Sequence, residues 1–337
     1  MILTLIICTF KRPEAIRKLL ASITSCSIKP QNILIVDSSP EDDTRNAVSG
    51  IEFKDLGINY FKVAEEDRGL TKQRNFGISR LPSNAEIVAF LDDDIRVEPD
   101  YFRELIRTYS LKNDAIGVGG IDLQENKYIK KDFGYKYSKF NYYELDGWVA
   151  KEPLRYKARK LFGLMPALQP GLIPKYSHGR SALPPNGKIY RVEHLMGGIA
   201  SYKVELLKNI KFSTFFEGYG LYEDFDFCVR ATKYGNLYVN TNAKVWHYHE
   251  TAGRPDYYKY GKMVVRNGWY VWRVKYPSPS LTAKLKWHFI TILLAHIRLV
   301  NSILGPYRKD SLMDYLGRIT SWFRILVNPP FINQESC

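Results

Sequence analysis

The polypeptide has 337 residues, of which 45% are hydrophobic and 25% charged, so we expect one large or two modest globular domains. Its formal net charge of +14 implies attraction to something anionic, such as nucleic acid, a phosphate-bearing substrate or an acidic membrane surface. The four cysteines show no metal-ligand spacing, which argues against a disulfide framework or a zinc site and favours a reducing cytoplasm.

The first 120 residues alternate between short apolar runs and amphipathic segments. Strands are predicted at Leu3–Ile7, Ile33–Val36, Asn59–Val63, Ile87–Leu91 and Ile116–Val118. Helices are predicted from Pro13 onward, over Leu70–Arg80 and over Tyr101–Tyr109. The apolar start lacks a basic segment and a cleavage site, so it is interpreted as a buried strand and not as a signal peptide. The alternation predicts an α/β fold with a mostly parallel central sheet.

Polar residues follow several of these strands directly. Thr9, Asp37 and Asp67 lie just past predicted strand ends, and the cluster Asp92–Asp94 closes the most apolar strand. In parallel sheets, ligands bind at the carboxyl ends of the strands. The pattern therefore predicts a nucleotide site, in which Asp37 is suited to accept from a base N–H.

The acidic cluster also suits a metal ion. Asp92 and Asp94 alternate along extended backbone and so share a side, and two hard oxygen donors suit Mg²⁺ or Mn²⁺. A solvated acidic turn is the simpler alternative. Lys72 and Arg74, on the helix before this strand, are placed to meet phosphate oxygens, although an exposed helix face is the commoner setting for such charges.

The segment Ile121–Arg191 interrupts the alternation of predicted strands and helices. It is rich in tyrosine, lysine and proline, and its sequence pattern assigns no regular structure to it. A loop region of this length inside a domain is usually functional or mobile, so it is either an acceptor-binding excursion or a surface insertion.

Sequence patterns typical of regular secondary structure resume near Val192. Gly197 and Gly198 would let the backbone approach a ligand closely. A helix is predicted to begin near Glu223 and Asp224, where the helix dipole keeps a carboxylate ionised, as a cap or as a general base. His247 and His249 share a side of extended backbone and suit either a metal shell or an ordinary strand end.

Two apolar stripes mark the carboxyl-terminal region. Trp287–Leu304 is long and apolar, but the polar residues within it argue against an uninterrupted membrane span. A second stripe runs from Leu316 to Leu326, with basic residues and a tryptophan beside it. Such helices suit a membrane interface, and packing on the catalytic domain or a dimer seam is the alternative.

Taken together, the motifs resemble those of the family 2 glycosyltransferases, which have the GT-A fold. Thr9–Pro13 resembles the T-[FY]-x-R-P loop of that family, and Val36–Ser39 resembles its V-D-[ND]-[SG]-S turn. The remaining matches are Arg68–Gly77, with Gln73 in place of a small residue, the D-x-D motif at Asp92–Asp94, the E-D-x-D segment at Gly218–Asp226, and the late histidine His247. Several motifs in the right order carry the resemblance, because a lone D-x-D is weak evidence.

The resemblance implies inverting, metal-dependent transfer of one sugar from a nucleotide-diphosphate-sugar, UDP- or dTDP-linked, to a hydroxyl of a glycan or lipid-linked acceptor. Arg266–Trp269 does not match the motif of processive synthases, so a single addition is expected. The implied nucleotide-sugar ligands are Thr9, Arg12, Asp37, Asp67, Lys72, Arg74, Asp92 and Asp93. The implied ligands of Mn²⁺ or Mg²⁺ are Asp94, Asp92, His247 and His249. Asp224 is the implied general base, and Glu223 positions the acceptor or the base.

We expect a catalytic domain over 1–255, followed by a helical extension over 256–337 that is able to associate with a membrane. The catalytic domain would comprise a nucleotide-binding half at 1–120, an insertion at 121–191 and an acceptor-binding half at 192–255. A cytoplasmic protein, peripheral at the inner face of the cell membrane, is expected. The resemblance names neither the sugar nor the acceptor.

Three other function classes compete. A nucleic-acid-binding protein would need a recognisable basic module, which the sequence lacks. A non-catalytic sugar-nucleotide-binding protein is disfavoured by the presence of both acidic motifs. A nucleotidyltransferase would usually carry a glycine-rich loop after the first strand, and Cys8–Pro13 lacks glycine.

Overall fold

The structure is a computed structural model, and it describes residues 1–216, 218–250 and 255–332. The chain forms two compact units, each built from two separate stretches of sequence. The first unit comprises Met1–Asn126 and Pro185–Arg254, and the second comprises Lys127–Pro184 and Pro255–Cys337. This grouping differs from the expected division at 255, because most of the predicted 121–191 insertion belongs to the same unit as the carboxyl-terminal helices.

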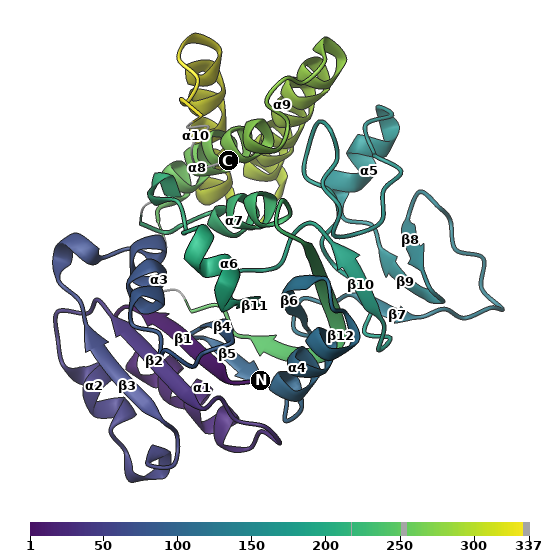
Figure 1. The fold of residues 1–337 in the computed structure, drawn as a ribbon. Coiled ribbons are helices and arrows are strands. Elements are labelled where there is room, and N and C mark those ends of the chain that lie inside the picture. The colour runs from purple at the N-terminus through teal and green to yellow at the C-terminus, as the bar shows by residue number, and fades with distance from the viewer. Residues whose placement is uncertain (217, 251–254, 333–337) are drawn as a thin grey trace. The chain divides into compact units, whose positions relative to one another are not determined.

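The first unit is organised around a nine-stranded sheet with helices packed on it (Figure 1). The strands along the sheet are β10 (Ile189–Val192), β12 (Asn236–His247), β6 (Ala115–Asp122), β11 (Ile199–Lys203), β4 (Ile87–Asp92), β1 (Leu3–Thr9), β2 (Asn32–Asp37) and β3 (Ile58–Lys62), and β5 (Ile95–Val97) pairs with β12. The helices are α1 (Pro13–Thr24), α2 (Asp43–Val48), α3 (Leu70–Ser79), α4 (Tyr101–Leu111), α6 (Val204–Asn209) and α7 (Glu223–Ala231).

Parallel pairing governs the amino-terminal half of this sheet. β4, β1, β2 and β3 are parallel neighbours, and β6 and β12 are parallel as well, which confirms the predicted fold class. The apolar runs of β1, β2, β4 and β6 are buried on both faces, as parallel strands covered by helices require, whereas β3 at the edge is only partly buried. The sequence did not predict the antiparallel strands β5 and β10, and β11 joins β4 to β6 in antiparallel register.

The first helix shows how local sequence fixes this packing. α1 begins with Pro13, whose missing N–H and preset φ suit the first helical turn. Its apolar positions recur at helical spacing, and Ile16, Leu19, Leu20 and Ile23 are all fully buried in the core. Burying each such side chain contributes roughly 1.5–3 kcal/mol, so this face holds the helix against the sheet.

β12 runs as one strand from Asn236 to His247. A register shift between Val239 and Lys244 separates its pairing with β6 into two stretches. Irregularities of this kind bend a strand. Beyond the shift, β12 also pairs with β5, and His247 lies opposite Ile95. This pairing brings a histidine from late in the chain beside the acidic cluster that precedes β5.

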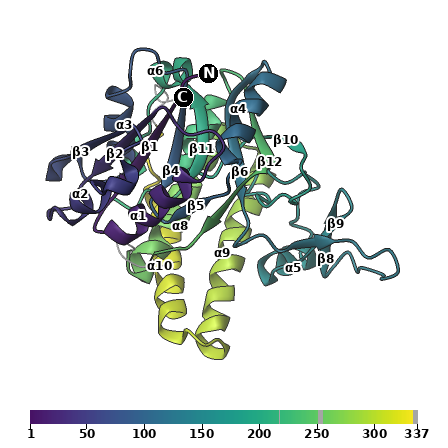
Figure 2. The same cartoon turned by 90° about the horizontal axis from the view of Figure 1, so that it is seen from below.

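The Lys127–Pro184 stretch of the second unit contains regular structure that the sequence did not predict. A three-stranded antiparallel sheet is formed by β7 (Tyr128–Lys130), β9 (Trp148–Lys151) and β8 (Tyr142–Leu145), and α5 (Leu154–Leu161) follows it. Three long helices complete the unit: α8 (Tyr257–Lys275), α9 (Leu281–Leu304) and α10 (Arg308–Val327). Figure 2 shows α9 and α10 side by side.

A tryptophan-rich core joins the two stretches of the second unit. Trp272 stacks on Trp287 with ring centroids 5.5 Å apart, and Ile325 belongs to the same cluster. The Trp272 indole N–H donates to the carbonyl oxygen of Lys175 at 2.8 Å, and the Tyr276 hydroxyl donates to the carbonyl oxygen of Ile173 at 2.8 Å. The segment before Pro184 is therefore fastened to α8.

Candidate active site

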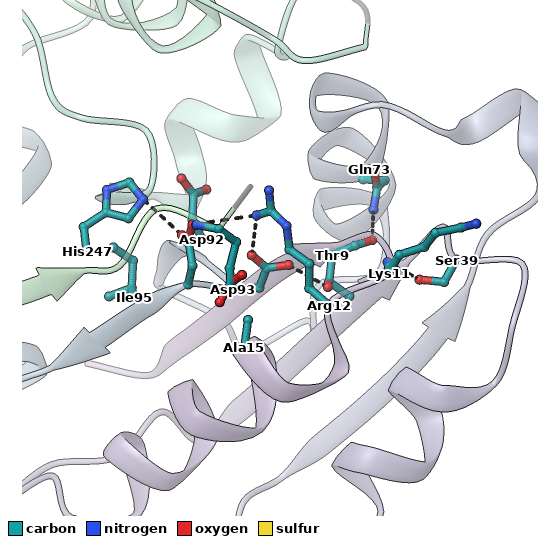
Figure 3. Close-up of polar contacts among 12 residues, drawn as sticks. Thr9, Lys11, Arg12, Ala15, Ser39, Gln73, Asp92, Asp93, Ile95 and His247 are labelled. Atoms are coloured by element: carbon teal, nitrogen blue, oxygen red, sulfur yellow. Dashed lines mark hydrogen bonds and ion pairs between the residues drawn. The ribbon is translucent and has the colours of Figure 1, made fainter. Parts of the chain in front are cut away.

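The acidic cluster lies in the turn between β4 and β5, and its three carboxylates have different partners. Asp93 points into the protein, where the Thr9 hydroxyl donates to it at 2.7 Å and the Arg12 guanidinium donates at 2.9 Å (Figure 3). Burial raises the pKa of Asp93 to about 6, while Arg12 and Thr9 oppose that rise. Asp93 thus joins the loop after β1 to the end of β4.

Asp94 is paired with His247. The His247 Nε2 lies 3.0 Å from Asp94 Oδ1, and the backbone N–H of Glu250 donates to Asp94 Oδ2 at 2.9 Å. Burial would raise the pKa of Asp94, but His247 and the Glu250 N–H outweigh it and hold the pKa at about 2. The carboxylate is therefore ionised at neutral pH.

Asp92, Asp94 and His247 form a group suited to a divalent cation. One ligand atom from each lies within 4.8 Å of the others. Two carboxylate oxygens with one imidazole nitrogen suit Mn²⁺ well, and Mg²⁺ accepts the oxygens. The donor set fits the cofactor that the sequence predicts.

Arg74 connects this group to the start of α7. Its guanidinium is buried, ion-pairs with Glu223 and lies 3.5 Å from Asp92 Oδ1. It also packs over the rings of Phe90 and Phe212. Burial lowers the pKa of Arg74, but the two carboxylates more than offset it, so the guanidinium is charged. Burial raises the pKa of Glu223 to about 8, and Arg74 opposes that rise.

Asp224 lies in the first turn of α7 with 21% of its side chain exposed. Its Oδ2 accepts from the Gly197 N–H at 3.1 Å and lies 3.2 Å from His194 Nε2, while Oδ1 accepts from the Phe225 N–H at 2.8 Å. Burial would raise the pKa of Asp224, but His194 and the two N–H groups lower it below its usual range. An ionised, partly exposed carboxylate is what a general base requires.

Sequence reasoning did not single out His194. Its ring stacks on Phe225 with centroids 3.6 Å apart and an interplanar angle of 16°, which fixes the direction of Nε2. Only its position three residues before the Gly197–Gly198 pair could have drawn attention to it.

The two glycines allow a close approach between the backbone and the site's carboxylates. A Cβ on Gly198 would lie 2.3 Å from Asp92 Oδ2, and one on Gly197 would lie 2.7 Å from Glu223 Oε1. Any side chain there would displace these carboxylates. The pair therefore allows the segment between β10 and β11, which also carries His194, to lie close to Asp92 and Glu223.

Residues expected around a nucleoside gather at the ends of β1 and β2. Asp37 is buried and accepts from the Tyr60 hydroxyl at 2.7 Å and from the Ser39 N–H at 2.8 Å. Gln73 donates to the carbonyl oxygens of Thr9 and Val36 at 3.1 and 2.8 Å, so it fastens α3 to both strand ends. This contact accounts for glutamine where a small residue was expected.

The other two residues predicted to bind the nucleotide-sugar are Asp67 and Lys72. Asp67 is exposed in the 3-10 turn Glu65–Asp67. Lys72 is half-buried in the first turn of α3, and its ammonium donates to the Glu66 carbonyl oxygen of the 3-10 turn at 2.7 Å. These contacts therefore join the two residues to the 3-10 turn and not to the acidic cluster.

His249 groups with a residue that the sequence analysis did not name. Its Nε2 lies 2.9 Å from Glu125 Oε1, and it forms a second possible metal group with Asp122 and His247. Asp122 ends β6, which runs four residues beyond the predicted strand end at Val118. With that end placed correctly, the rule that carboxylates follow strands would have found Asp122.

Comparisons with known proteins agree with this geometry. Residues 4–167 match the model of the family described as Glycosyl transferase family 2. The chain is 27% identical over 119 residues to a glucosyl-dolichyl phosphate glucuronosyltransferase of Haloferax volcanii, covering 35% of this chain and 37% of that protein. It is 32% identical over 92 residues to a GalNAc(5)-diNAcBac-PP-undecaprenol beta-1,3-glucosyltransferase of Campylobacter jejuni, covering 27% and 29%. The aligned segments thus span only about a third of these relatives.

A solved structure shares the fold over almost the whole chain. The mannosyltransferase PcManGT from Pyrobaculum calidifontis, in complex with GDP-Man and Mn²⁺, superposes with a TM-score of 0.52 at 15% identity. The match covers 98% of this chain and 76% of that one, and it supports a GT-A fold. The structural likeness shows the fold, while the family model over residues 4–167 and the curated relatives support a family 2 glycosyltransferase.

Proposed function

We propose that the protein transfers one sugar from a nucleotide-diphosphate-sugar to a hydroxyl of a glycan or lipid-linked acceptor, with inversion and a single addition. A UDP- or dTDP-linked donor is expected. The observation that carries the proposal is a continuous set of contacts from Asp224, the proposed base, to Asp92 in the group suited to a cation. Asp224 accepts from Gly197, the adjacent Gly198 abuts Asp92, and Arg74 joins Asp92 to Glu223.

Donor binding follows from the residues at the strand ends. Asp92, Asp94 and His247 would hold Mn²⁺ or Mg²⁺, which when bound neutralises the charge of the departing nucleotide diphosphate. Thr9, Arg12 and Asp37 line the proposed nucleoside end, and Arg74 adds positive charge beside Asp92. The neighbour solved with GDP-Man and Mn²⁺ supports a metal-dependent nucleotide-sugar donor.

Asp224 would act as the general base. Its carboxylate accepts the proton of the acceptor hydroxyl while that oxygen attacks the anomeric carbon from the face opposite the leaving group. The bond from the anomeric carbon to the diphosphate oxygen breaks, and the electron pair leaves with the nucleotide diphosphate. One displacement inverts the anomeric configuration. Glu223, held by Arg74, keeps the start of α7 in place beside the base.

The names of the relatives favour a lipid-linked acceptor, since they refer to dolichyl phosphate and to undecaprenol. In the described part of the chain, α9 is the one helix long and apolar enough to cross a membrane by length and composition. Only 17% of its most apolar stretch is buried. Exposed apolar side chains occur along α9 and α10: Leu281, Leu285, Phe289, Val300, Ile303, Leu304, Leu312, Met313, Leu316, Phe323, Leu326 and Val327.

We propose that these helices lie in the interface of an anionic membrane at the cytoplasmic face, where such an acceptor would be reached. Basic residues such as Lys284, Arg308, Lys309 and Arg324 lie on the same helices and are exposed. Anionic lipid attracts each basic residue near its surface by about 1 kcal/mol.

The direct test is turnover of a panel of nucleotide sugars by the purified full-length protein, with Mn²⁺ and undecaprenyl- or dolichyl-linked acceptors. Transfer that requires Asp224 and a divalent cation is expected. A non-catalytic sugar-nucleotide-binding protein would instead bind the nucleotide with Mn²⁺ and show the same background hydrolysis in wild type and Asp224→Asn.

A further inference from the structure

A second group of metal-ligand side chains lies where β6 and β12 end. Asp122, His247 and His249 each offer one ligand atom, and these atoms lie within 4.8 Å of one another. Asp122 closes β6 and pairs with Val245 of β12, so two neighbouring strands hold the group together. His247 also belongs to the group with Asp92 and Asp94.

Asp122 has one satisfied oxygen and one unsatisfied oxygen. Its side chain is buried, with 8% of the residue exposed. Oδ1 accepts from the backbone N–H of Gln124 at 2.9 Å and of His247 at 3.2 Å. Oδ2 is buried and has no hydrogen-bond partner in the part of the chain that the structure describes. An unpaired buried carboxylate oxygen is unfavourable, and a bound cation would satisfy it.

His249 carries the outer contact typical of a metal ligand, since its Nε2 lies 2.9 Å from Glu125 Oε1. The Nε2 of His247 lies 3.0 Å from Asp94 Oδ1, which belongs to the first metal group. The centroids of the His247 and His249 rings lie 3.9 Å apart. A histidine that binds a metal usually donates its other ring N–H to a carboxylate, which orients the ring. With Nε2 of His249 directed at a carboxylate, Nδ1 of that ring is the nitrogen left for a cation.

We propose that Asp122, His247 and His249 form a second divalent-cation position, which takes a cation that prefers imidazole, such as Zn²⁺. Two imidazoles and one carboxylate are a common zinc donor set, whereas Mg²⁺ prefers oxygen donors. A neutral imidazole has one lone pair for a metal. His247 therefore serves either the Asp92–Asp94 position through Nε2 or the second position through Nδ1, and the two positions compete.

The first test measures Zn²⁺ binding by the full-length protein without nucleotide or acceptor, in competition with a chromophoric chelator. His249→Gln and Asp122→Asn should each lower the affinity for Zn²⁺ at least tenfold, about the loss expected when a ligand or its support is removed. Asp92→Asn, which alters only the first position, should bind Zn²⁺ within about twofold of wild type. Equal losses in Asp92→Asn and His249→Gln, or no loss in His249→Gln, would overturn the second position.

Folding is controlled within the same design. Asp122→Asn keeps an oxygen for the two backbone donors and removes only the charge and the free Oδ2, and His249 is partly exposed. Thermal melts in chelator establish that each variant is folded. If Asp122→Asn does not fold, His249→Gln decides the outcome.

The second test concerns competition. Mn²⁺ binding to the full-length protein is followed by electron paramagnetic resonance, with and without saturating Zn²⁺. Zn²⁺ should weaken Mn²⁺ binding in wild type and should weaken it much less in His249→Gln. Mn²⁺ affinity that is unchanged by Zn²⁺ in wild type would show independent sites and overturn the sharing of His247. Neither readout requires sugar transfer, so failure here is distinct from failure of the proposed function.

Discussion

His194 lies against Asp224, with Nε2 3.2 Å from Oδ2. The same oxygen accepts the Gly197 N–H, and the imidazole is held flat on Phe225. The orientation of the proposed base is therefore set from two sides before any acceptor arrives. Both contacts lower the pKa of Asp224, so it is poised as an ionised proton acceptor rather than as an acid.

Replacing the base should abolish most transfer. Asp224→Asn is nearly isosteric but cannot take up the proton, so kcat should fall on the order of 10²–10⁴-fold, the usual worth of general-base catalysis. Donor affinity, measured by calorimetry with Mn²⁺, should barely change. Asp43→Asn is the matched control, because Asp43 is an exposed carboxylate in the first turn of α2. Near wild-type turnover in Asp224→Asn would move the base to Glu223 or Asp226.

Removing His194 should shift the pH dependence of transfer. Because His194 lowers the pKa of Asp224, its loss should raise that pKa, and the acidic limb of the kcat profile should move to higher pH. His194→Phe keeps a ring on Phe225 but removes the nitrogen, whereas His194→Gln keeps a neutral donor. The acidic limb should move further toward high pH in His194→Phe than in His194→Gln. Identical profiles in both variants and wild type would show that His194 only fills space.

Asp94 should be required for metal-dependent donor binding. Asp94→Ala removes one of the three proposed cation ligands and the partner of His247. Nucleotide affinity in Mn²⁺ should then fall to the value measured in chelator. Calorimetry with UDP or GDP checks this, and unchanged affinity in the folded variant would contradict the assignment. Asp43→Ala again serves as the control.

Removing only one partner of the ion pair between Arg74 and Glu223 should destabilise the protein. Arg74→Met leaves Glu223 buried without its partner, so the free energy of unfolding should fall by about 3–5 kcal/mol. The double variant with Glu223→Gln should recover part of that loss. Arg103→Met removes a half-exposed pair with Asp100, and its cost should stay below about 1 kcal/mol. The free energies of unfolding of these three variants are measured by urea unfolding, and equal losses in Arg74→Met and Arg103→Met would show that burial of the pair does not matter.

Membrane association should depend on the exposed end of α9. Ile303 and Leu304 are 62% and 78% exposed, and replacing both with glutamate should lower binding to anionic vesicles at least tenfold. Ile51→Glu is the matched control, because Ile51 is 81% exposed in the first unit. Flotation of the full-length protein measures the bound fraction. Equal flotation of all three proteins would point to a structural role for these helices.

The sequence was most informative where one local rule decides the structure. Continuous apolar runs identified β1, β2 and β4, and the carboxylates after them identified Asp92, Asp94 and Asp37. The rule failed at β6, because Gly119 and Gly120 interrupt its apolar run and so hid its true end. Gly120 is required there by packing, since a Cβ would lie 2.3 Å from the Ala243 carbonyl oxygen.

Local sequence patterns could not predict contacts between residues that are far apart in the sequence. His194 becomes significant only because β11 and α7 bring it to Asp224 from thirty positions away. The structure of the Lys127–Pro184 stretch was missed for a similar reason. α5 contacts α9, and the segment before Pro184 is held by α8 through the Trp272 contact with Lys175, so both depend on helices that follow much later in the chain.

The interleaved order of the two units has a consequence for biosynthesis. The stretch Lys127–Pro184 leaves the ribosome before the helices that complete its core, and roughly 140 residues must follow before α10 is whole. At about 5–20 residues per second, that wait is on the order of ten seconds. The nine-stranded sheet, by contrast, has all its strands once His247 has emerged. All the strands of the first unit are thus translated before α9 and α10, so the sheet has its full set of strands before the exposed apolar side chains of those helices are made.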